Sequence, residues 1–327
     1  MNVSFRNVFG WFVACLLIMF GFVGRAVRRA KRGECLLSIY FHKPSRSEFE
    51  TCIKWLKKKG FIFISTRDIE KIIQQELPFP MGAVLITVDD GWQTNEANIV
   101  EIANKHQVPV TIFVSTSPVE EGTYWWSYML EAKRNRLKSP HIEAMKRVPD
   151  HERLTQVAKL KRKLTLEREA MTVDQVRKMA DSEYITVGGH SHTHPILTNC
   201  TDEQVYFELQ CSKRILEGWI GKQVPFFAYP NGDYGLREVQ TLQKLDYKLA
   251  FSCEPVPLTP ASLGKTYELP RLGFLEGASF EENLCRIVGV WHPIMSRLKF
   301  PFYRKHSYKR ADALSANCAA STVLCES

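Results

Sequence analysis

The feature that most constrains the fold is an alternation between short apolar runs and segments whose apolar residues recur with helical spacing. The apolar runs are expected to be strands: Cys35–Phe41, Phe61–Ser65, Ala83–Val88, Pro109–Val114, Tyr184–Val187, Phe226–Tyr229 and Tyr247–Ser252. The helical segments are Ser47–Lys59, Arg67–Gln74, Glu96–Lys105, Thr201–Trp219 and Leu236–Leu245. Strands that alternate with helices pair in parallel, and seven such runs favour a (β/α) barrel over an open sheet.

Residues 119–182 interrupt this alternation. The stretches "TYWWSYMLEAKRNRLK" and "RLTQVAKLKRKLTLE" are polar with helical spacing, and they predict a helical insertion between the fourth and fifth strands. The length of 327 residues suits one large domain or two small ones. We expect one folded domain over residues 33–296 that contains this insertion, preceded by a separate segment, 1–32, and followed by a poorly ordered basic tail, 297–327.

The N-terminal segment has the composition of a membrane anchor. Asn7–Gly24 holds no charged residue, and Arg25–Arg32 holds five basic residues and no acid. Eighteen helical residues reach about 27 Å, close to the hydrocarbon thickness of a bilayer. The positive-inside rule then places the following chain in the cytoplasm. An interfacial helix, an anchor that exports the chain to the periplasmic or extracellular side, and a buried soluble helix are the alternatives.

The net charge of +9 is local, because the basic residues gather in Arg25–Arg32, Lys133–Lys178 and Arg297–Arg310. Such stretches favour contact with an anionic membrane surface or a lipid-linked substrate, and a solvated helix face is the alternative for Lys133–Lys178. No nucleic-acid-binding module is recognisable. The nine cysteines form no C-x-x-C pair, which argues against a disulfide framework. Nothing in the sequence indicates an oligomeric state.

Two adjacent acids follow the third predicted strand. In "TVDDGW", Asp89 and Asp90 come directly after Ala83–Val88 and before Gly91. Adjacent carboxylates at a buried strand end repel each other, and a metal ion or a proton would relieve that repulsion. A strand-ending turn is the alternative, since Asp and Gly are common turn residues.

Three histidines follow the fifth predicted strand, in "GGHSHTHP". If this segment opens a helical turn, His190 and His194 point the same way and His192 points elsewhere. Two imidazoles and a carboxylate from another strand end would form a metal site with positions left for water, as in catalytic sites. A polar loop with incidental histidines is the alternative.

Three further residues lie near ends of predicted strands. Asn231, in "PFFAYPNGDYG", lies in a loop that can aim a backbone N–H at an oxyanion, although a plain turn fits equally well. His42 follows the first strand, and taken alone it is a surface histidine. Arg271, in "YELPRLGF", taken alone predicts a surface ion pair.

These positions share one edge of the predicted fold. The carboxyl ends of parallel strands meet on one face of a barrel, where active sites lie. The residues that follow predicted strands are His42, Asp89, Asp90, His190, His194 and Asn231. The sequence therefore predicts a polar site at this face.

The motifs "TVDDG", "HSHTH" and "FAYPNG" resemble the three leading motifs of the polysaccharide deacetylases, the NodB-like group also called carbohydrate esterase family four. The segments "YFHKP", "TYWW" and "MTVDQVRKMA" are similar to parts of its biofilm-polysaccharide branch. The resemblance spans about residues 35–275. It departs at Val88, Ala228 and Asn231, where the family more often has Phe, Arg and Tyr.

The resemblance implies a distorted (β/α)7 barrel with a divalent metal, most often zinc. The implied metal ligands are Asp90, His190 and His194. Asp89 would be the general base, His42 the general acid and Asn231 the backbone oxyanion donor, and Arg271 would orient Asp89.

The implied activity is hydrolysis of N-acetyl groups on amino sugars of a polysaccharide or lipid-linked glycan, giving free amine and acetate. O-deacetylation or deformylation of a glycan on the same metal is an alternative. A non-catalytic carbohydrate- or lipid-binding protein at the membrane surface, or a membrane scaffold, is an alternative of a different class.

Overall fold

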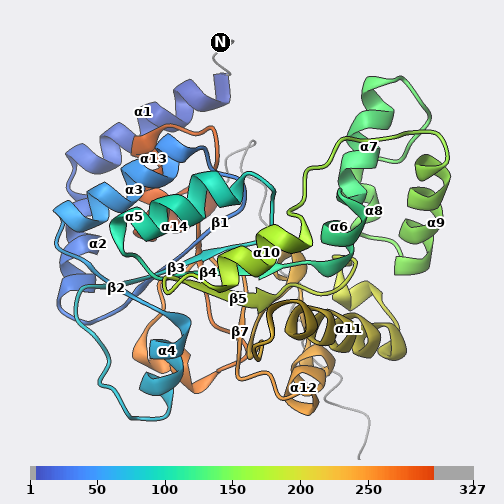
Figure 1. The fold of residues 1–327 in the computed structure, drawn as a ribbon. Helices are drawn as coiled ribbons and strands as arrows, with labels where there is room; N and C mark the ends of the chain where they lie inside the picture. Colours follow the sequence, from blue (N-terminus) through green and yellow to red (C-terminus); the bar gives the residue numbers. More distant parts are fainter. Residues whose placement is uncertain (1–4, 298–327) are drawn as a thin grey trace, which may run out of the picture.

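The computed structural model describes residues 5–297, which form one parallel sheet with helices packed around it (Figure 1). Seven of its eight strands lie in the order β7-β6-β5-β4-β3-β1-β8, and the eighth, β2, pairs with β3 off this path. Every registered pair is parallel. The strands are β1 Leu37–Phe41, β2 Ile62–Ile64, β3 Ala83–Val88, β4 Val110–Val114, β5 Ile185–Gly189, β6 Phe226–Ala228, β7 Leu249–Phe251 and β8 Leu272–Gly273.

All seven predicted strands are present, and the prediction of a parallel α/β architecture is confirmed. β3 is buried along its whole length, because one face packs against helices and the other against side chains of other strands, among them Phe113, Phe226 and Phe251. β8 was not predicted, because two residues are too few to give a periodic pattern. An isolated parallel bridge between Phe251 and Leu269 brings the chain before β8 close to β7, at the other end of the strand order.

Capping boxes begin three of the helices around the sheet, at Ser45, Ser65 and Thr201. The predicted helix over Glu96–Lys105 begins as a π-helical turn, Glu96–Val100. The helices outside the insertion and the N-terminal segment are α3 Arg46–Lys58, α4 Thr66–Ile73, α5 Glu101–His106, α11 Asp202–Ile220, α12 Leu236–Lys244, α13 Phe280–Ile287 and α14 Trp291–Arg297.

The predicted helical insertion is confirmed between β4 and β5. Its helices are α6 Thr116–Glu121, α7 Trp125–Arg134, α8 Ile142–Met145, α9 Asp150–Lys161 and α10 Val173–Ala180. α7, α8 and α9 stand apart from the sheet, on the opposite side of the view from α1 (Figure 1). They share a small core of their own, made by Trp125, Met129, Ala132, Met145, Val157 and Leu160.

The continuous anchor helix predicted over Asn7–Gly24 is not confirmed. The segment forms two helices, α1 Phe5–Met19 and α2 Phe22–Lys31, which meet at 62° where Gly21 takes a left-handed φ of 74°. Within residues 5–297, no single helix is long and apolar enough to cross a bilayer. Only this bent pair, taken together, has the length and composition to do so.

α1 packs along α13 through Gly10, Ala14 and Leu17, which are buried. Arg6 forms an ion pair of 2.5 Å with the fully buried carboxylate of Glu282. The tail predicted over 297–327 lies, apart from Arg297, outside the described residues.

Candidate active site

Asp89 and Asp90 leave the end of β3 in different directions. The Asp89 N–H donates to the Phe41 carbonyl at 2.9 Å and continues the β1–β3 pairing, whereas Asp90 has a left-handed φ of 78°. Gly91 follows with a φ of 86°. This turn separates two carboxylates that are adjacent in the sequence, and each carboxylate then meets partners of its own.

Asp90 meets two histidines. One ligand atom from each of Asp90, His190 and His194 lies within 4.8 Å of the other two. The Asp90 Oδ1 atom is 3.5 Å from His190 Nε2 and 3.3 Å from His194 Nε2. The other Asp90 oxygen accepts a hydrogen bond of 2.9 Å from the Trp92 indole. The structure thus brings together the three residues predicted as metal ligands.

The donor set fits a divalent cation. His190 Nδ1 lies 2.8 Å from the Ala228 carbonyl, which can only accept, so Nδ1 carries the proton. In the neutral ring the Nε2 lone pair then points at the Asp90 carboxylate, an unfavourable arrangement that a cation between them resolves. Two imidazoles and one carboxylate suit zinc and leave coordination positions open.

The histidine loop does not form the helical turn that was expected to point His190 and His194 the same way. Ser191 and His194 have left-handed φ angles of 64° and 55°, and these break any helical path. The two rings still converge, with centroids 4.8 Å apart. His192 points elsewhere, as expected, and its Nδ1 is 2.7 Å from the Thr116 hydroxyl.

Asp89 forms a buried, bidentate ion pair with Arg271. The guanidinium donates to the two carboxylate oxygens at 2.7 and 2.8 Å, and Arg271 is fully buried. It also donates to the Ser252 carbonyl and the Thr87 hydroxyl, and it lies 4.6 Å from the centre of the Tyr40 ring. The prediction that Arg271, taken alone, forms a surface ion pair is therefore wrong, because its side chain is fully buried next to Asp89.

Both acids ionise readily in this setting. Burial raises the pKa of Asp89, but the Arg271 charge and its hydrogen bonds outweigh burial, so that the pKa lies below the usual value. Burial likewise opposes ionisation of Asp90, and its bonds to the two histidines hold its pKa well below the usual value. Asp89 is therefore a carboxylate at neutral pH, the form in which it can accept a proton.

These groups open into one cavity of about 330 Å³. It is lined by Tyr40, His42, Asp89, Asp90, Trp125, Trp126, Ile142, Lys146, His190, His194, Ile196, Asn231 and Cys253. His42 and Asn231 thus share the cavity with the acids, as predicted. Asn231 has a left-handed φ of 58°, and its side chain accepts a hydrogen bond of 3.0 Å from Lys146.

The helical insertion supplies one wall of this cavity, a contact that the sequence pattern does not predict. The Trp126 ring lies edge-on to His194 at 4.8 Å, and the Trp125 indole donates to the His194 carbonyl at 3.1 Å. Lys146 reaches the cavity from the turn after α8. The "TYWW" motif was the available signal, but aromatic spacing alone does not reveal which element these rings face.

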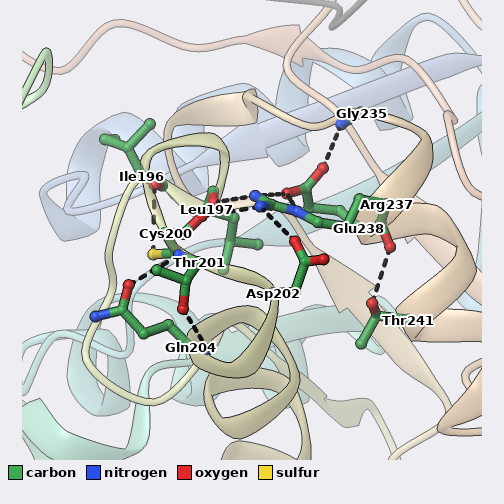
Figure 2. A network of polar contacts seen from close by, with 10 residues as sticks. All are labelled: Ile196, Leu197, Cys200, Thr201, Asp202, Gln204, Gly235, Arg237, Glu238 and Thr241. Carbon is green, nitrogen blue, oxygen red and sulfur yellow. Dashed lines mark hydrogen bonds and ion pairs between the residues drawn. The ribbon is translucent and has the colours of Figure 1, made fainter. Parts of the chain in front are cut away.

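The segment after the histidine loop is held by a polar network that centres on Arg237 of α12 (Figure 2). Its guanidinium donates to the Leu197 and Cys200 carbonyls at 2.9 and 2.8 Å and pairs with Asp202 and Glu238. Glu238 in turn accepts from the Gly235 N–H at 2.8 Å. The network joins the loop that contains Asn231 to the chain that follows His194.

Comparison with known sequences identifies one family. A sequence profile described as polysaccharide deacetylase matches residues 77–250, more than half of the chain. A poly-beta-1,6-N-acetyl-D-glucosamine N-deacetylase of Staphylococcus aureus is 24% identical over 245 residues, covering 75% of this chain and 72% of its own. YxkH of Bacillus subtilis, named as a polysaccharide deacetylase, is 20% identical over 210 residues, covering 64% of this chain and only 58% of its own.

Solved structures share the fold. A Streptococcus pyogenes deacetylase, PplD, in complex with acetate superposes with a TM-score of 0.58 at 17% identity, covering 78% of this chain and 98% of its own. IcaB from Ammonifex degensii gives 0.57 at 17% identity, covering 79% and 97%. At this level of identity the likeness concerns the arrangement of strands and helices.

Proposed function

Because the chain belongs to the polysaccharide deacetylase family, we propose that it is a metal-dependent hydrolase that removes N-acetyl groups from amino sugars of a polysaccharide or lipid-linked glycan. The observation that carries this proposal is the convergence of Asp90, His190 and His194 beside the Asp89–Arg271 pair in one cavity. The named activity of the staphylococcal relatives makes poly-β-1,6-N-acetylglucosamine the first substrate to try. We also propose that the sheet closes into the distorted (β/α)7 barrel of the family. The bridge between Phe251 and Leu269 supports this, because it brings together the two ends of the strand order.

Asp90, His190 and His194 would hold the divalent cation, for which we propose zinc. When bound, such a cation polarises the acetyl carbonyl and lowers the pKa of water at the site. The second nitrogen of His190 remains bonded to the Ala228 carbonyl, which fixes the ring for this role.

The remaining roles follow from the position of each group. Asp89, held by Arg271, takes a proton from the attacking water. The Asn231 backbone N–H would stabilise the negative charge that develops on the carbonyl oxygen. His42, which follows the C-terminal end of β1 and lines the same cavity, would give a proton to the departing amine. Free amine and acetate leave in equal amounts.

Product analysis tests the reaction class. The purified full-length chain, supplied with zinc, is incubated with N-acetylglucosamine oligomers and, separately, with O-acetylated glycans. We expect acetate and new primary amines in equal amounts from the first substrate. Acetate from the O-acetylated glycan alone would favour the esterase alternative, and formate from N-formylated sugars the deformylase alternative. Oligomers bound without turnover by zinc-loaded protein would favour the non-catalytic alternative.

We also propose that residues 1–32 contact a membrane and that the domain over 33–296 lies on its cytoplasmic side. α1 buries one face against α13 and leaves the opposite, apolar face exposed. The exposed apolar residues of this segment are Phe5, Val8, Trp11, Phe12, Met19, Phe20 and Phe22. The basic residues of α2 follow directly and complement anionic phospholipid. Together these features suit a helix pair that lies in the plane of the lipid headgroups.

Vesicle sedimentation tests this contact. The full chain should sediment with phosphatidylglycerol vesicles and much less with phosphatidylcholine vesicles. Arg25→Glu with Arg28→Glu should abolish the difference, and Phe12→Ser with Phe20→Ser should weaken binding to both. Equal sedimentation of wild type and all variants would refute the proposal.

A further inference from the structure

The loop that carries His190 and His194 is gripped by a buried carboxylate from a neighbouring helix. Glu208, in the middle of α11, is 5% exposed. One of its oxygens accepts from the backbone N–H groups of His192 and Thr193 at 2.8 and 2.7 Å, and the other accepts from the Thr193 hydroxyl at 2.7 Å. The carboxylate therefore makes three hydrogen bonds within the five-residue segment that begins and ends with a metal ligand.

A buried arginine from the helical insertion also forms a hydrogen bond with Thr193. Arg153 of α9 is 2% exposed and donates to the Thr193 hydroxyl at 3.0 Å. Its Nε atom donates to Asp150 at 2.7 Å, and its guanidinium carbon lies 5.5 Å from the centroid of the Trp125 ring. Trp125 donates in turn to the His194 carbonyl.

We propose that Glu208 and Arg153 are positioning residues that meet at Thr193 and hold the histidine loop in its ligand geometry. The helical insertion is then a structural part of the metal site as well as a wall of the cavity. This inference rests on the proposed function, since it concerns the same cation.

The physical reason lies in the backbone of the loop. Ser191 and His194 both have left-handed φ angles, which cost energy for residues with a Cβ atom and persist only where surrounding contacts fix them. Thr193 lies between them and bridges the two buried charges. Without that bridge the loop relaxes before metal binds, and part of the binding free energy is lost in reordering it.

Arg237 provides an internal comparison. Its network fixes residues 197–202, beyond the second ligand, and does not touch the segment between the ligands (Figure 2). The Thr193 bridge acts on the segment between the ligands, so its loss should affect metal affinity more directly.

The test compares Thr193→Val with Thr193→Ser in the full-length chain. Valine keeps the shape but removes the hydroxyl that both charges share, whereas serine keeps the hydroxyl. Zinc is titrated into metal-free protein against a competing chelator. We expect Thr193→Val to weaken zinc affinity by about tenfold or more, in the range usual for groups that orient metal ligands. Thr193→Ser should stay within about threefold of wild type, a change of less than about 0.7 kcal/mol.

A second variant tests the insertion itself. Arg153→Met combined with Asp150→Asn removes the charge of Arg153 together with that of its ion-pair partner, and Arg162→Met, at the exposed residue directly after α9, is the control. The double variant should weaken zinc binding and change the visible spectrum of the cobalt-substituted protein, and the control should do neither. Melting of the metal-free proteins separates lost loop order from global unfolding.

The outcomes separate the two proposals. If wild type binds zinc and Thr193→Val and the Arg153 double variant bind it equally well, the positioning role is refuted while the metal site stands. If wild type binds no zinc, the metal site itself is refuted, and the positioning role with it. If Thr193→Ser loses as much affinity as Thr193→Val, the hydroxyl bridge is not the cause.

Discussion

Asp89 and Asp90 are adjacent in the sequence, and the fold gives them different partners. Asp89 is bound on both oxygens by Arg271, and Asp90 faces the two histidines. The left-handed turn at Asp90 separates them, so each carboxylate has hydrogen-bond partners of its own. Under the proposed function, this division would allow one acid to remain a proton acceptor while its neighbour binds the cation.

The division predicts that Asp89→Asn separates catalysis from metal binding. The amide cannot accept the proton, so kcat should fall by about 10²–10⁴. Zinc affinity should change little, because Asp90 and the histidines are untouched. His190→Ala is the matched variant and should lose both zinc affinity and activity. An Asp89→Asn enzyme with full zinc and undiminished turnover would refute the base assignment.

Arg271→Met should destabilise the protein strongly. It leaves the Asp89 charge buried without a partner, and breaking a buried pair in this way costs about 3–5 kcal/mol. The double variant with Asp89→Asn should recover part of that loss. Arg29→Met, which breaks an exposed pair with Glu34, is the control and should leave the free energy of unfolding nearly unchanged. Urea unfolding measures all four proteins, and equal losses in the two single variants would contradict the buried pair.

Zinc binding should release protons near neutral pH. In the metal-free protein, burial lowers the pKa of His190, but the bond to Asp90 and the charges of Asp89 and Asp90 outweigh burial and raise it above the usual value. The imidazolium therefore persists to a higher pH, and it must lose its proton to bind metal. Affinity should therefore fall as the pH falls, and the fall should begin above the usual histidine pKa of about 6.5. Titration calorimetry in two buffers of different ionisation enthalpy measures the release, and identical heats would contradict it.

At the scale of elements, the predicted strands agree with the structure to within two residues at each end. Apolar runs bounded by turn residues carry enough local information for this. The histidine loop was predicted less well, because left-handed φ angles are uncommon at residues other than glycine and the residue types at Ser191 and His194 do not by themselves predict them. The insertion was predicted as helical, but its contact with the site depends on tertiary packing.

The contact of α7 with the cavity predicts a role for Trp126 in substrate binding. Trp126→Ala should raise KM for N-acetylglucosamine oligomers by about 2–12-fold, the value of an aromatic packing contact. Leu130→Ala, an exposed position on the same helix, is the control and should leave KM unaltered. Steady-state kinetics over oligomer length checks both. A KM unchanged in Trp126→Ala would exclude this wall from the binding site.

At the scale of the whole molecule, the site was predictable because parallel topology brings strand ends together. The acids follow β3, the histidines follow β5 and Asn231 follows β6, so local motifs and one topological rule suffice to assemble them. The contacts of Glu208 and Arg153 with the histidine loop were missed, since they depend on which helices pack beside the loop. The docking of α1 on α13 was missed for the same reason, because the segments lie at opposite ends of the described chain.

The central claim is that a cation between Asp90, His190 and His194 is required for N-deacetylation. The most direct measurement is acetate release from N-acetylglucosamine oligomers by metal-stripped full-length protein, before and after one equivalent of zinc is returned. We predict no release above background before zinc is added and a recovered rate afterwards, with no recovery in Asp90→Ala. Equal release by the stripped protein, or full recovery in Asp90→Ala, would contradict the account.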